Sequence, residues 1–463
     1  MDMKRILIVG AGVAGTDVLR EINQDKTSNF KVIGFIDDDL QKRDAVILGS
    51  KVLGGIDQIS SIIDRKKIEE VIVAIPSADG EKIARYVEIC AQKKVVVMIV
   101  PRVKEIIEGK AHLNTLRRVK VEDLLGRPVV KDDVHFLKVF FREKTILITG
   151  AAGSIGSELS RQVVAYNPRR IVFVDWWENG MFYLKQSIEK EFPKAKVIFV
   201  IGNIQNKTKM DRLFNKYHFN YVFHAAAYKH VPAMEENPEE AVENNIFGTV
   251  NLARISLRYS VERFVCISTD KAADPKSVMG MTKLIAERVA SSLNGKKTKF
   301  IKVRFGNVLD SFGSVVPIFR RQIEEGGPVT VTDKRMTRYF MTIPEAVQLI
   351  LKASYLGKGG ELFVLDMGRP IRILDLAEQM IRLSGLVPYK EMPIIFTGKR
   401  RGEKLHERLF TKDEKLATTT MDKIYIASPN GKRPQLKQEL KKLKNLMKTG
   451  DGRLLINYLK LIS

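Results

Sequence analysis

Residues 144–163 read "KTILITGAAGSIGSELSRQV", and this stretch decides the fold class of the larger part of the chain. A short apolar run that predicts a buried strand is followed by Gly150, Gly153 and Gly156 and then by a helix-like pattern. Glycines at this spacing let the backbone turn tightly and approach a pyrophosphate, whose charge is stabilised by the amino terminus of the next helix. The stretch therefore predicts a nucleotide-binding α/β domain.

The same arrangement occurs near the amino terminus of the chain. Residues 5–22, "RILIVGAGVAGTDVLREI", place Gly10, Gly12 and Gly15 between a strand and a helix, and Asp37 to Asp39 follow the next apolar run. Apolar strands then alternate with amphipathic helices, which is typical of parallel sheets with crossover helices. We expect two Rossmann-like, doubly wound α/β domains. The first domain either binds a nucleotide or is a docking domain that keeps the turn.

The segments after the second glycine turn carry groups that a dinucleotide needs. Asp175 ends the strand "RIVFVD", 25 residues after the first glycine of that turn, where its carboxylate would accept ribose hydroxyls and repel a 2′-phosphate. This favours NAD over NADP, although Arg169 and Arg170 lie nearby in the sequence. Asn203 follows the next apolar run, in a position often filled by an adenine-contacting acid. Small residues at 225–227 would let the chain pass close to the cofactor.

The stretch "STDKAADPKSVMGMTK" ends a further strand and begins the next helix. Thr269, Asp270 and Lys271 lie side by side at the end of the strand, and Lys283 lies on the helix. Because ligands of open α/β sheets bind at the carboxyl ends of the strands, these side chains should converge beside a nicotinamide ring. Met279, one helical turn before Lys283, can neither accept nor donate a proton.

These motifs resemble the extended short-chain dehydrogenase/reductases, and most of all the membrane-type UDP-N-acetylglucosamine 4,6-dehydratases of bacterial capsule, lipopolysaccharide and glycan biosynthesis. The matching stretches are "TGAAGSIGSE", "HAAAYKHVPAMEENPEEAVENNIFGT", "STDKAADPKSVMGMTK", "RFGNVLDSFGSVVPIFRRQI", "TRYFMT" and "RRGEKLHE". The amino-terminal domain is also similar to the nucleotide-fold domain of the larger members. Those members carry transmembrane helices ahead of both domains, whereas no apolar run here reaches the ~18 residues that span a bilayer.

The resemblance implies an extended short-chain dehydrogenase/reductase domain with a smaller carboxy-terminal substrate-binding subdomain. We expect three parts: 1–135 for the amino-terminal nucleotide-fold domain, 136–428 for the dehydratase domain (cofactor part about 140–303, substrate part about 304–428) and 429–463 for a basic helical tail.

The activity implied by the resemblance is the NAD-dependent removal of water from a UDP-N-acetylhexosamine, UDP-N-acetylglucosamine above all, to give a 4-keto-6-deoxy sugar. By resemblance, Thr269 hydrogen-bonds oxygen 4, Asp270 protonates the departing hydroxyl, Lys271 removes the proton on carbon 5, and Lys283 holds the nicotinamide ribose. Met279 matches the members that retain configuration at carbon 5, whereas inverting relatives carry a tyrosine there. Asp270, Lys283 and a water remain the candidate acceptors of the oxygen 4 proton.

Further positions are expected from the resemblance to bind the two ligands. The cofactor set is Gly150, Gly153, Ser154, Ile155, Gly156, Asp175, Asn203, Ile204, Ala225, Ala226, Ala227, Lys229, Asn245 and Lys283. The substrate set is Lys229, Arg304, Asn307, Gly313, Ser314, Val315, Arg338, Arg401 and Glu403. Arginine suits bidentate phosphate contact, and a salt bridge is the alternative for each arginine. The six histidines lack metal-ligand spacing and there is no CxxC, so no metal site is expected.

The composition limits the partners. The formal net charge is +24, which an anionic nucleotide substrate, an anionic membrane surface or simply a lysine-rich surface would explain. No nucleic-acid-binding motif is present. Cys90 and Cys266 lie in apolar surroundings and are expected to be free thiols. The first residues enter a strand directly, so no signal peptide is expected, and the predicted location is the cytoplasm, with the inner face of the membrane left open.

Residues 432–463 hold nine Lys or Arg and two acids, with Leu436, Leu440, Leu443 and Met447 at helical spacing. This predicts a basic amphipathic helix, which either packs its apolar side against the domain or lies on an anionic membrane; packing is favoured. A homo-oligomer is expected, because dimers through paired helices are usual for this fold.

Two further functions fit parts of the pattern. A nucleotide-sugar 4-epimerase would use the same cofactor site, and a non-catalytic dinucleotide sensor would fit the missing tyrosine. The Asp270–Lys271 pair after Thr269 discriminates among the three, because an epimerase or simple reductase of this fold has no use for it.

Overall fold

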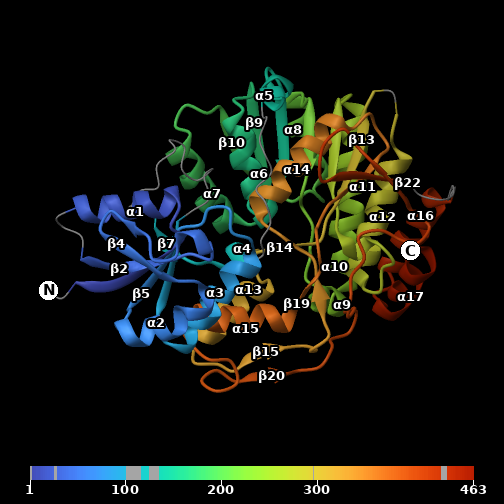
Figure 1. Cartoon of the computed structure of the whole chain (residues 1–463). Coiled ribbons are helices and arrows are strands. Elements are labelled where there is room, and N and C mark those ends of the chain that lie inside the picture. Colours follow the sequence, from blue (N-terminus) through green and yellow to red (C-terminus); the bar gives the residue numbers. More distant parts are fainter. Residues whose placement is uncertain (1–2, 26–28, 101–115, 125–134, 296, 429–434) are drawn as a thin grey trace. The chain divides into compact units, whose positions relative to one another are not determined.

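The computed structural model describes residues 3–25, 29–100, 116–124, 135–295, 297–428 and 435–463. The chain forms two compact units (Figure 1). Unit 1 comprises Met1–Pro128, Ile318–Lys334 and Ile373–Thr397, and unit 2 comprises Val129–Pro317, Arg335–Arg372 and Gly398–Ser463.

Unit 1 contains a seven-stranded sheet with the order β3-β4-β2-β1-β5-β6-β7. Its strands are β1 Lys4–Val9, β2 Phe30–Ile36, β3 Val46–Ile47, β4 Ser50–Gly54, β5 Glu70–Val73, β6 Val96–Ile99 and β7 Arg117–Arg118. The inner pairs are parallel, and β3 and β7 pair antiparallel at the two edges. The crossover helices are α1 Val13–Gln24, α2 Ile59–Lys66 and α3 Gly80–Gln92, and α4 Val121–Leu124 follows β7. The first predicted Rossmann-like sheet is thus confirmed.

Unit 1 also includes residues 318–324 of α13 Val315–Glu324, together with a further helix and two strands from later in the sequence. These three elements are α15 Ile373–Leu383, β15 Val329–Val331 and β20 Ile394–Phe396. Strands β15 and β20 pair in parallel, and Leu383 packs against the core that α3 and β6 help to form.

Unit 2 contains a nine-stranded sheet with the order β10-β9-β8-β11-β12-β13-β18-β22-β21. Its strands are β8 Thr145–Thr149, β9 Arg170–Asp175, β10 Val197–Ile201, β11 Tyr221–His224, β12 Arg263–Ile267, β13 Lys299–Arg304, β18 Leu362–Leu365, β21 Lys415–Thr418 and β22 Ile424–Ser428. Neighbouring strands from β10 to β18 pair in parallel, whereas β22 pairs antiparallel with both β18 and β21. The strand order reverses beside β8, between β9 and β11, which is where Rossmann folds bind dinucleotides.

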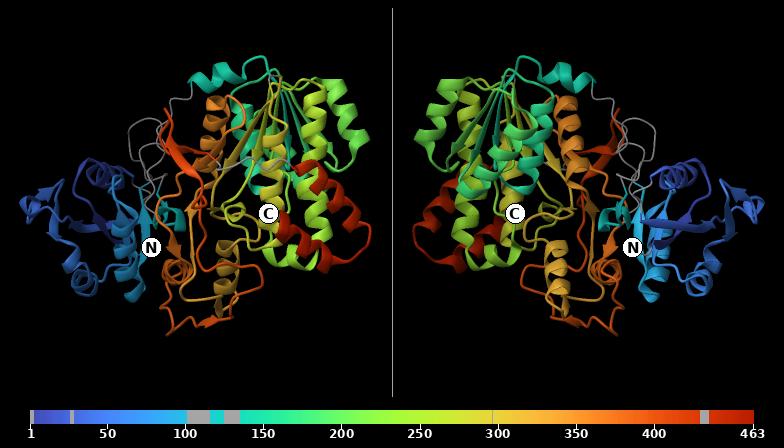
Figure 2. Two further views of the ribbon diagram at one scale, coloured as in Figure 1. Left: turned by 90° about the vertical axis from the view of Figure 1, so that its right-hand side faces the viewer. Right: turned by 90° about the vertical axis from the view of Figure 1, so that its left-hand side faces the viewer.

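Helices cover both faces of this sheet (Figure 2). All of β8 is buried; Ile146 and Ile148 face one core and Leu147 the other, because side chains alternate along a strand. The first core includes α5 His135–Phe141, α6 Ser154–Ala165, α7 Glu178–Glu191 and α14 Ile343–Leu356. The second includes α8 Lys207–Tyr217, α9 Val231–Glu236, α10 Pro238–Ala241, α11 Thr249–Arg258 and α12 Val278–Ser292. This is the second predicted Rossmann-like sheet.

Short elements complete the described chain after β13. They are β14 Asn307–Val308 paired with β17 Phe340–Met341, β16 Thr337–Arg338 paired with β19 Ile371–Arg372, and α13 Val315–Glu324.

The basic tail packs on unit 2, as the sequence predicts, but it forms two helices rather than one. These are α16 Leu436–Met447 and α17 Gly452–Ile462, which lie together beside α12 (Figure 1). Leu443 and Leu455 are fully buried in the α12 core. The break between the helices follows from Gly450, with φ +68°, and from Asp451, which caps α17 by accepting from the Leu454 amide at 3.0 Å. Predicted tail residues 429–434 lie outside the described residues.

Both cysteines are buried free thiols, as expected. Within the described ranges, no helix combines the length and apolarity that a membrane span requires.

Candidate active site

The glycine turn after β8 has the geometry that its sequence predicts. Gly150 has φ +69°, and a side chain there would meet the backbone of Ala226 at 2.5 Å. A Cβ on Gly156 would lie 1.8 Å from the Gly150 carbonyl oxygen. The turn therefore tolerates only glycine at these two positions. The glycine turn leads into α6, with Gly153 as the N-cap and Ser154 and Ile155 in the first turn. Ala225–Ala227 directly follow β11, the strand next to β8, at the same carboxyl end of the sheet.

Asp175 braces this turn from the end of β9. One carboxylate oxygen accepts from the Ala152 amide at 3.0 Å and the other from the Trp177 amide at 2.9 Å. Asp175 is buried. A carboxylate oxygen has more than one acceptor position, so these bonds leave Asp175 able to accept a ribose hydroxyl.

Asn203 and Ile204 follow β10 at the same edge of the sheet. The Asn203 side chain accepts from the Gln205 amide at 2.8 Å, and the Ile204 carbonyl accepts from Asn251 at 2.6 Å. The side chain of Ile204 packs where a Cβ on Gly248 would intrude. Asn203 thus shapes a turn, and Ile204 joins that turn to the region around α11.

Asn245 lies in the π-helical turn Val242–Gly248 that precedes α11. Its amide accepts from the Tyr228 nitrogen at 2.8 Å and donates to the Tyr228 carbonyl at 3.0 Å and to Thr282 at 3.1 Å. Asn245 therefore fixes the segment that carries Lys229. Partial desolvation, together with the positive charge of Lys271, lowers the pKa of Lys229.

Thr269, Asp270 and Lys271 form one hydrogen-bonded cluster after β12. Asp270 is 0% exposed, and its Oδ1 accepts from Thr269 Oγ1 at 2.9 Å and from Lys271 Nζ at 3.0 Å. Lys271 Nζ also donates to Asn307 Oδ1 at 2.8 Å. Asp270 Oδ2 is buried and has no hydrogen-bond partner in the described part of the chain. An orphaned buried carboxylate oxygen is costly, and such groups concentrate at functional sites.

Met279 and Lys283 lie one turn apart on α12, and both are buried. Lys283 Nζ donates to the Ile267 carbonyl at 2.7 Å, which places the ammonium at the end of β12. Met279 belongs to the apolar core between the sheet and its helices. The position where inverting relatives of the resembled family carry a tyrosine is therefore occupied by a packed thioether.

The loop at 312–315 lies next to the glycine turn. The Phe312 amide donates to Ser154 Oγ at 3.0 Å, at the start of α6. Gly313 has φ +65° and approaches His230, which a side chain at 313 would meet at 2.6 Å. Ser314 Oγ is buried and has no hydrogen-bond partner within the described ranges, and Val315 begins α13. The predicted substrate wall is thus adjacent to the predicted cofactor turn.

Arg338, Arg401 and Glu403 belong to a second polar group on unit 2. Arg338 donates to the Thr337, Lys404 and Leu405 carbonyls at 2.7–3.1 Å, so its guanidinium holds the segment after Glu403. Glu403 accepts from the Arg400 amide at 3.1 Å. The Arg401 side chain is 71% exposed and lies 3.4 Å from a carboxylate oxygen of Glu235. Of the two arginines, Arg401 presents the more accessible cation.

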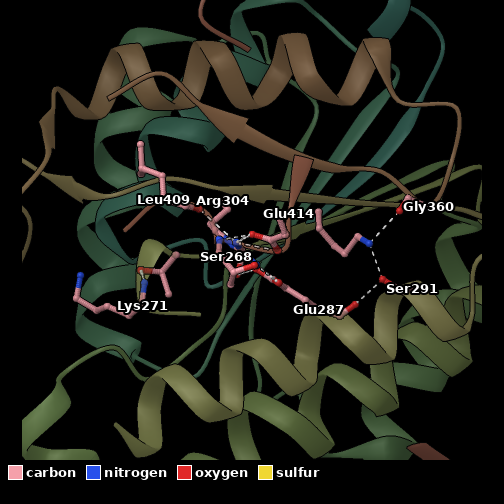
Figure 3. A network of polar contacts seen from close by, with 11 residues as sticks. Ser268, Lys271, Glu287, Ser291, Arg304, Gly360, Leu409 and Glu414 are labelled. Carbon is pink, nitrogen blue, oxygen red and sulfur yellow. Dashed lines mark hydrogen bonds and ion pairs between the residues drawn. The ribbon is translucent and has the colours of Figure 1, made fainter. Parts of the chain in front are cut away.

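Arg304 does not occupy the position that the sequence predicts for a substrate contact. It is 1% exposed, and Glu287, Glu414 and the Leu409 carbonyl accept from its guanidinium (Figure 3). Nε, Nη1 and Nη2 all donate to protein acceptors in the interior, so a phosphate cannot reach this guanidinium. Arg304 is therefore part of the scaffold below the site, and the salt-bridge alternative is the correct one, in buried form.

The comparisons with known proteins agree with this geometry. Residues 146–429 match the family described as polysaccharide biosynthesis protein. The chain belongs to this family. Capsular polysaccharide biosynthesis protein CapD of Staphylococcus aureus is 44% identical over 92% of this chain and 72% of its own length. UDP-N-acetylglucosamine 4,6-dehydratase (inverting) of Campylobacter jejuni is 34% identical over 63% of this chain and 84% of its own.

A solved structure, Pen from Bacillus thuringiensis, is 34% identical and superposes with a TM-score of 0.58 over 63% of this chain and 91% of its own. Residues 2–101 match a second family, described as CoA-binding domain. The resemblance to capsule-biosynthesis proteins and 4,6-dehydratases, and the extended short-chain dehydrogenase/reductase fold, are therefore confirmed.

Sequence reasoning missed two acids of the polysaccharide biosynthesis domain, the buried Glu287 and the partly buried Glu414, and the buried His224. Glu287 gives a usable signal: it lies four residues after Lys283 on an otherwise apolar face of α12. His224 bridges Thr149 and Thr249, each at 2.9 Å, and its burial, with the nearby charge of Lys283, lowers its pKa to about 3. Glu414 gives no comparable signal, because its partner Arg304 is 110 residues away.

Proposed function

We propose that the chain catalyses the NAD-dependent 4,6-dehydration of a UDP-N-acetylhexosamine, with UDP-N-acetylglucosamine as the first substrate to test, in the synthesis of a surface polysaccharide. The observation that carries the proposal is the cluster of Thr269, Asp270 and Lys271 with Asn307, beside Lys283 and without a tyrosine at 279. The names of the relatives, which include a 4,6-dehydratase and a capsule protein, support the same reaction class.

The residues present fit a dinucleotide. Gly150 and Gly156 let the turn pack directly against the Ala226 backbone and let α6 approach the Gly150 carbonyl, which any side chain would prevent, and the turn leads into the amino terminus of this 12-residue helix. Asp175 would accept the ribose hydroxyls, and its negative charge would disfavour the 2′-phosphate of NADP. When bound, NAD+ supplies a reversible hydride acceptor for carbon 4 and donor for carbon 6 of the sugar.

The chain itself moves the protons. We assign Asp270 as the acceptor of the oxygen 4 proton, because Oδ2 is the buried oxygen without a partner among the described residues. Thr269 would orient oxygen 4. Asp270 then carries the proton that oxygen 6 needs to leave as water, so one carboxyl group serves both steps without net proton loss.

Lys271 would remove the proton on carbon 5 in its neutral form and return it after hydride reaches carbon 6. Its ammonium lies 3.0 Å from Asp270 and 2.8 Å from Asn307, which restricts it to one side of the cluster. Because one group on one side removes and returns the proton, this arrangement supports retention of configuration at carbon 5.

The nucleotide would be held by the groups beyond the sugar. Lys229 and Lys271 supply positive charge on the sugar side, and Ser314 has a buried hydroxyl oxygen that lacks a described partner, which a phosphate oxygen would satisfy. The exposed guanidinium of Arg401 suits the phosphate end. Arg304 takes no part in this contact.

The test is incubation of the protein with UDP-N-acetylglucosamine, followed by mass spectrometry and NMR. Loss of one water from the sugar, with the proton on carbon 5 returned to the original face, would support the proposal. An isobaric product would identify a 4-epimerase instead, and no turnover with intact NAD binding would identify a dinucleotide sensor.

A further inference from the structure

Two buried cations on β13 define what we call the β13 network (Figure 3). Lys302 is 3% exposed and Arg304 is 1% exposed. They are two residues apart on one strand, so both project to the same face of the sheet. Both side chains donate hydrogen bonds to other protein groups, but to different ones, and this difference suggests separate roles.

Arg304 binds α12, the helix that carries Lys283. Its guanidinium donates to Glu287 on α12 through Nη2 at 2.7 Å and through Nε at 3.1 Å. Glu287 also accepts from the Ser268 hydroxyl, directly before Thr269. Burial alone would raise the pKa of Glu287, but the charge of Arg304 and the hydrogen bonds from Arg304 and Ser268 outweigh it and lower that pKa, so the carboxylate stays ionised.

The second branch of Arg304 reaches a distant segment of the chain. Nη1 donates to the Leu409 carbonyl at 3.2 Å and to Glu414 at 2.9 Å. Glu414 in turn accepts from the Thr411 amide at 2.7 Å, which closes the loop between these residues. One guanidinium therefore joins α12 to the segment at 409–414.

The backbone on either side of Arg304 holds the candidate catalytic turn. The Val303 carbonyl accepts from the Ser268 amide at 2.7 Å, and the Phe305 carbonyl accepts from the Asp270 amide at 2.9 Å. A movement of Arg304 along or out of the strand would move both contacts. Thr269, which lies between them, would move with them.

The same distant segment is also tied to the far end of the turn. Lys404 Nζ donates to the Ala273 carbonyl at 2.9 Å, and Arg338 holds the Lys404 and Leu405 carbonyls. The segment at 404–414 thus contacts the turn at 268–273 at one end and the strand that supports the turn at the other. This double attachment is what a coupling element requires.

We propose that Arg304 is a positioning residue that couples the segment at 404–414 to the catalytic turn at 268–273. It transmits the position of that segment, through Glu414 on one side and Glu287 on the other, to Thr269 and Asp270. The coupling is a property of the protein alone, and its effect on turnover rests on the proposed function. Arg401 and Glu403 immediately precede the segment, so substrate contacts there would be sensed at the turn.

Lys302 provides the matched control. It donates to Ser291 Oγ and to the Gly360 carbonyl, and no hydrogen bond from it to the segment at 404–414 is present in the described structure. Lys302→Met removes a cation as deeply buried as Arg304, from the same face of the same strand. An effect of equal size in both variants reports the loss of a buried positive charge near Glu287, whose pKa both cations lower, and an effect confined to the Arg304 side reports coupling.

The primary variant is Glu414→Gln, which keeps the size of the side chain and the acceptor for Thr411 but removes the charge opposite Arg304. The measurement is amide hydrogen exchange of the full chain without ligand, resolved by peptide. We expect exchange to become about tenfold faster at 404–414 and also at 268–273, because a buried charged hydrogen bond is weakened. Exchange in α6 should stay unchanged in Glu414→Gln, and Lys302→Met should leave 268–273 unchanged.

Two results would overturn the coupling. In one, 404–414 loosens while 268–273 does not respond; in the other, Lys302→Met loosens 268–273 as much as Glu414→Gln does. If the wild type converts UDP-N-acetylglucosamine, Glu414→Gln should lower kcat about tenfold with KM within about twofold, because the turn and not the binding surface is displaced. If the wild type converts no such substrate, the proposed function fails while the exchange result still decides the coupling.

Discussion

The two glycine turns of the chain are built alike and lead to different surroundings. In unit 1 a Cβ on Gly15 would lie 1.9 Å from the Gly10 carbonyl oxygen, and in unit 2 a Cβ on Gly156 would lie 1.8 Å from that of Gly150. Asp37 braces the first turn by accepting from the Ala11 amide at 2.8 Å, as Asp175 braces the second. The shared sequence pattern thus reports a shared backbone geometry.

The strands beyond the turns differ. In unit 1, β5 is followed by Ala74 and Ile75, apolar residues against which Gly10 packs. Asp37 and Asp38 are paired with Lys42 and Lys82 at 3.1 and 3.0 Å. In unit 2 the strand ends carry the Thr269–Lys271 cluster instead. A glycine fingerprint therefore predicts a turn, and the residues at the neighbouring strand ends decide whether chemistry can follow.

The largest expected effect comes from removing the base of unit 2. Lys271→Ala should lower the rate of product formation by about 10³-fold, in the range that general bases contribute, while NAD binding persists. The measurement is product formation by NMR together with a NAD titration. Lys82→Ala removes a lysine paired with an aspartate in unit 1 and should leave the rate unchanged. An active Lys271→Ala variant would show that another group removes the proton.

The second effect tests the two turns directly. Gly156→Ala forces its Cβ against Gly150, which should destabilise unit 2 by about 1–3 kcal/mol and weaken NAD binding by about 100-fold, because the helix terminus must move away from the strand. Gly15→Ala creates the same clash in unit 1. It should destabilise that unit to a similar degree without changing NAD affinity, as measured by calorimetric titration. Equal losses of affinity in both variants would place a nucleotide requirement in unit 1.

The third effect is a loss of stability in acid, which we expect in unit 2. Five of the six histidines lie in unit 2; the sixth, His112, belongs to unit 1 and lies outside the described residues. His224 has a folded pKa of about 3, lowered by burial from its ordinary value of 6.5. The unfolded state therefore binds a proton that the folded state excludes. Stability from this group is present above about pH 6.5 and is lost as the pH falls, by about 1.4 kcal/mol per unit.

The fluorescence of Trp176 and Trp177 reports unit 2 alone, since these are the two tryptophans of the chain. Denaturant unfolding followed by this fluorescence between pH 7 and pH 5 should show this slope. In His224→Gln an amide replaces the imidazole between the two threonines. The slope of the free energy of unfolding against pH should then correspond to the uptake of about one proton fewer on unfolding. An unchanged slope would mean that His224 becomes protonated without unfolding.

Local patterns predicted most of the fold and the cluster at its centre. Gly150–Gly156, Asp175 and Thr269–Lys271 are found from sequence because each lies at a fixed offset from a strand. Arg304 was wrongly predicted to contact the substrate. Its position on the strand predicts the face of the sheet to which it projects, but not the acidic side chains that it meets there. Glu414 reaches Arg304 only through the packing of β21 and β22 onto β18, a pairing that no local pattern encodes.

The smallest expected effect separates the two bracing aspartates. Asp175 and Asp37 each accept from two backbone amides. An asparagine at either position keeps one acceptor oxygen but sets its NH2 group against the second amide, so Asp175→Asn and Asp37→Asn should each loosen their turn slightly. Only Asp175→Asn removes the charge that opposes a 2′-phosphate, so only it should reduce the preference for NAD over NADP, by about tenfold. The ratio of the two dissociation constants is the measurement. A ratio that shifts equally in Asp37→Asn would assign cofactor selection to unit 1 and remove the distinction between the turns.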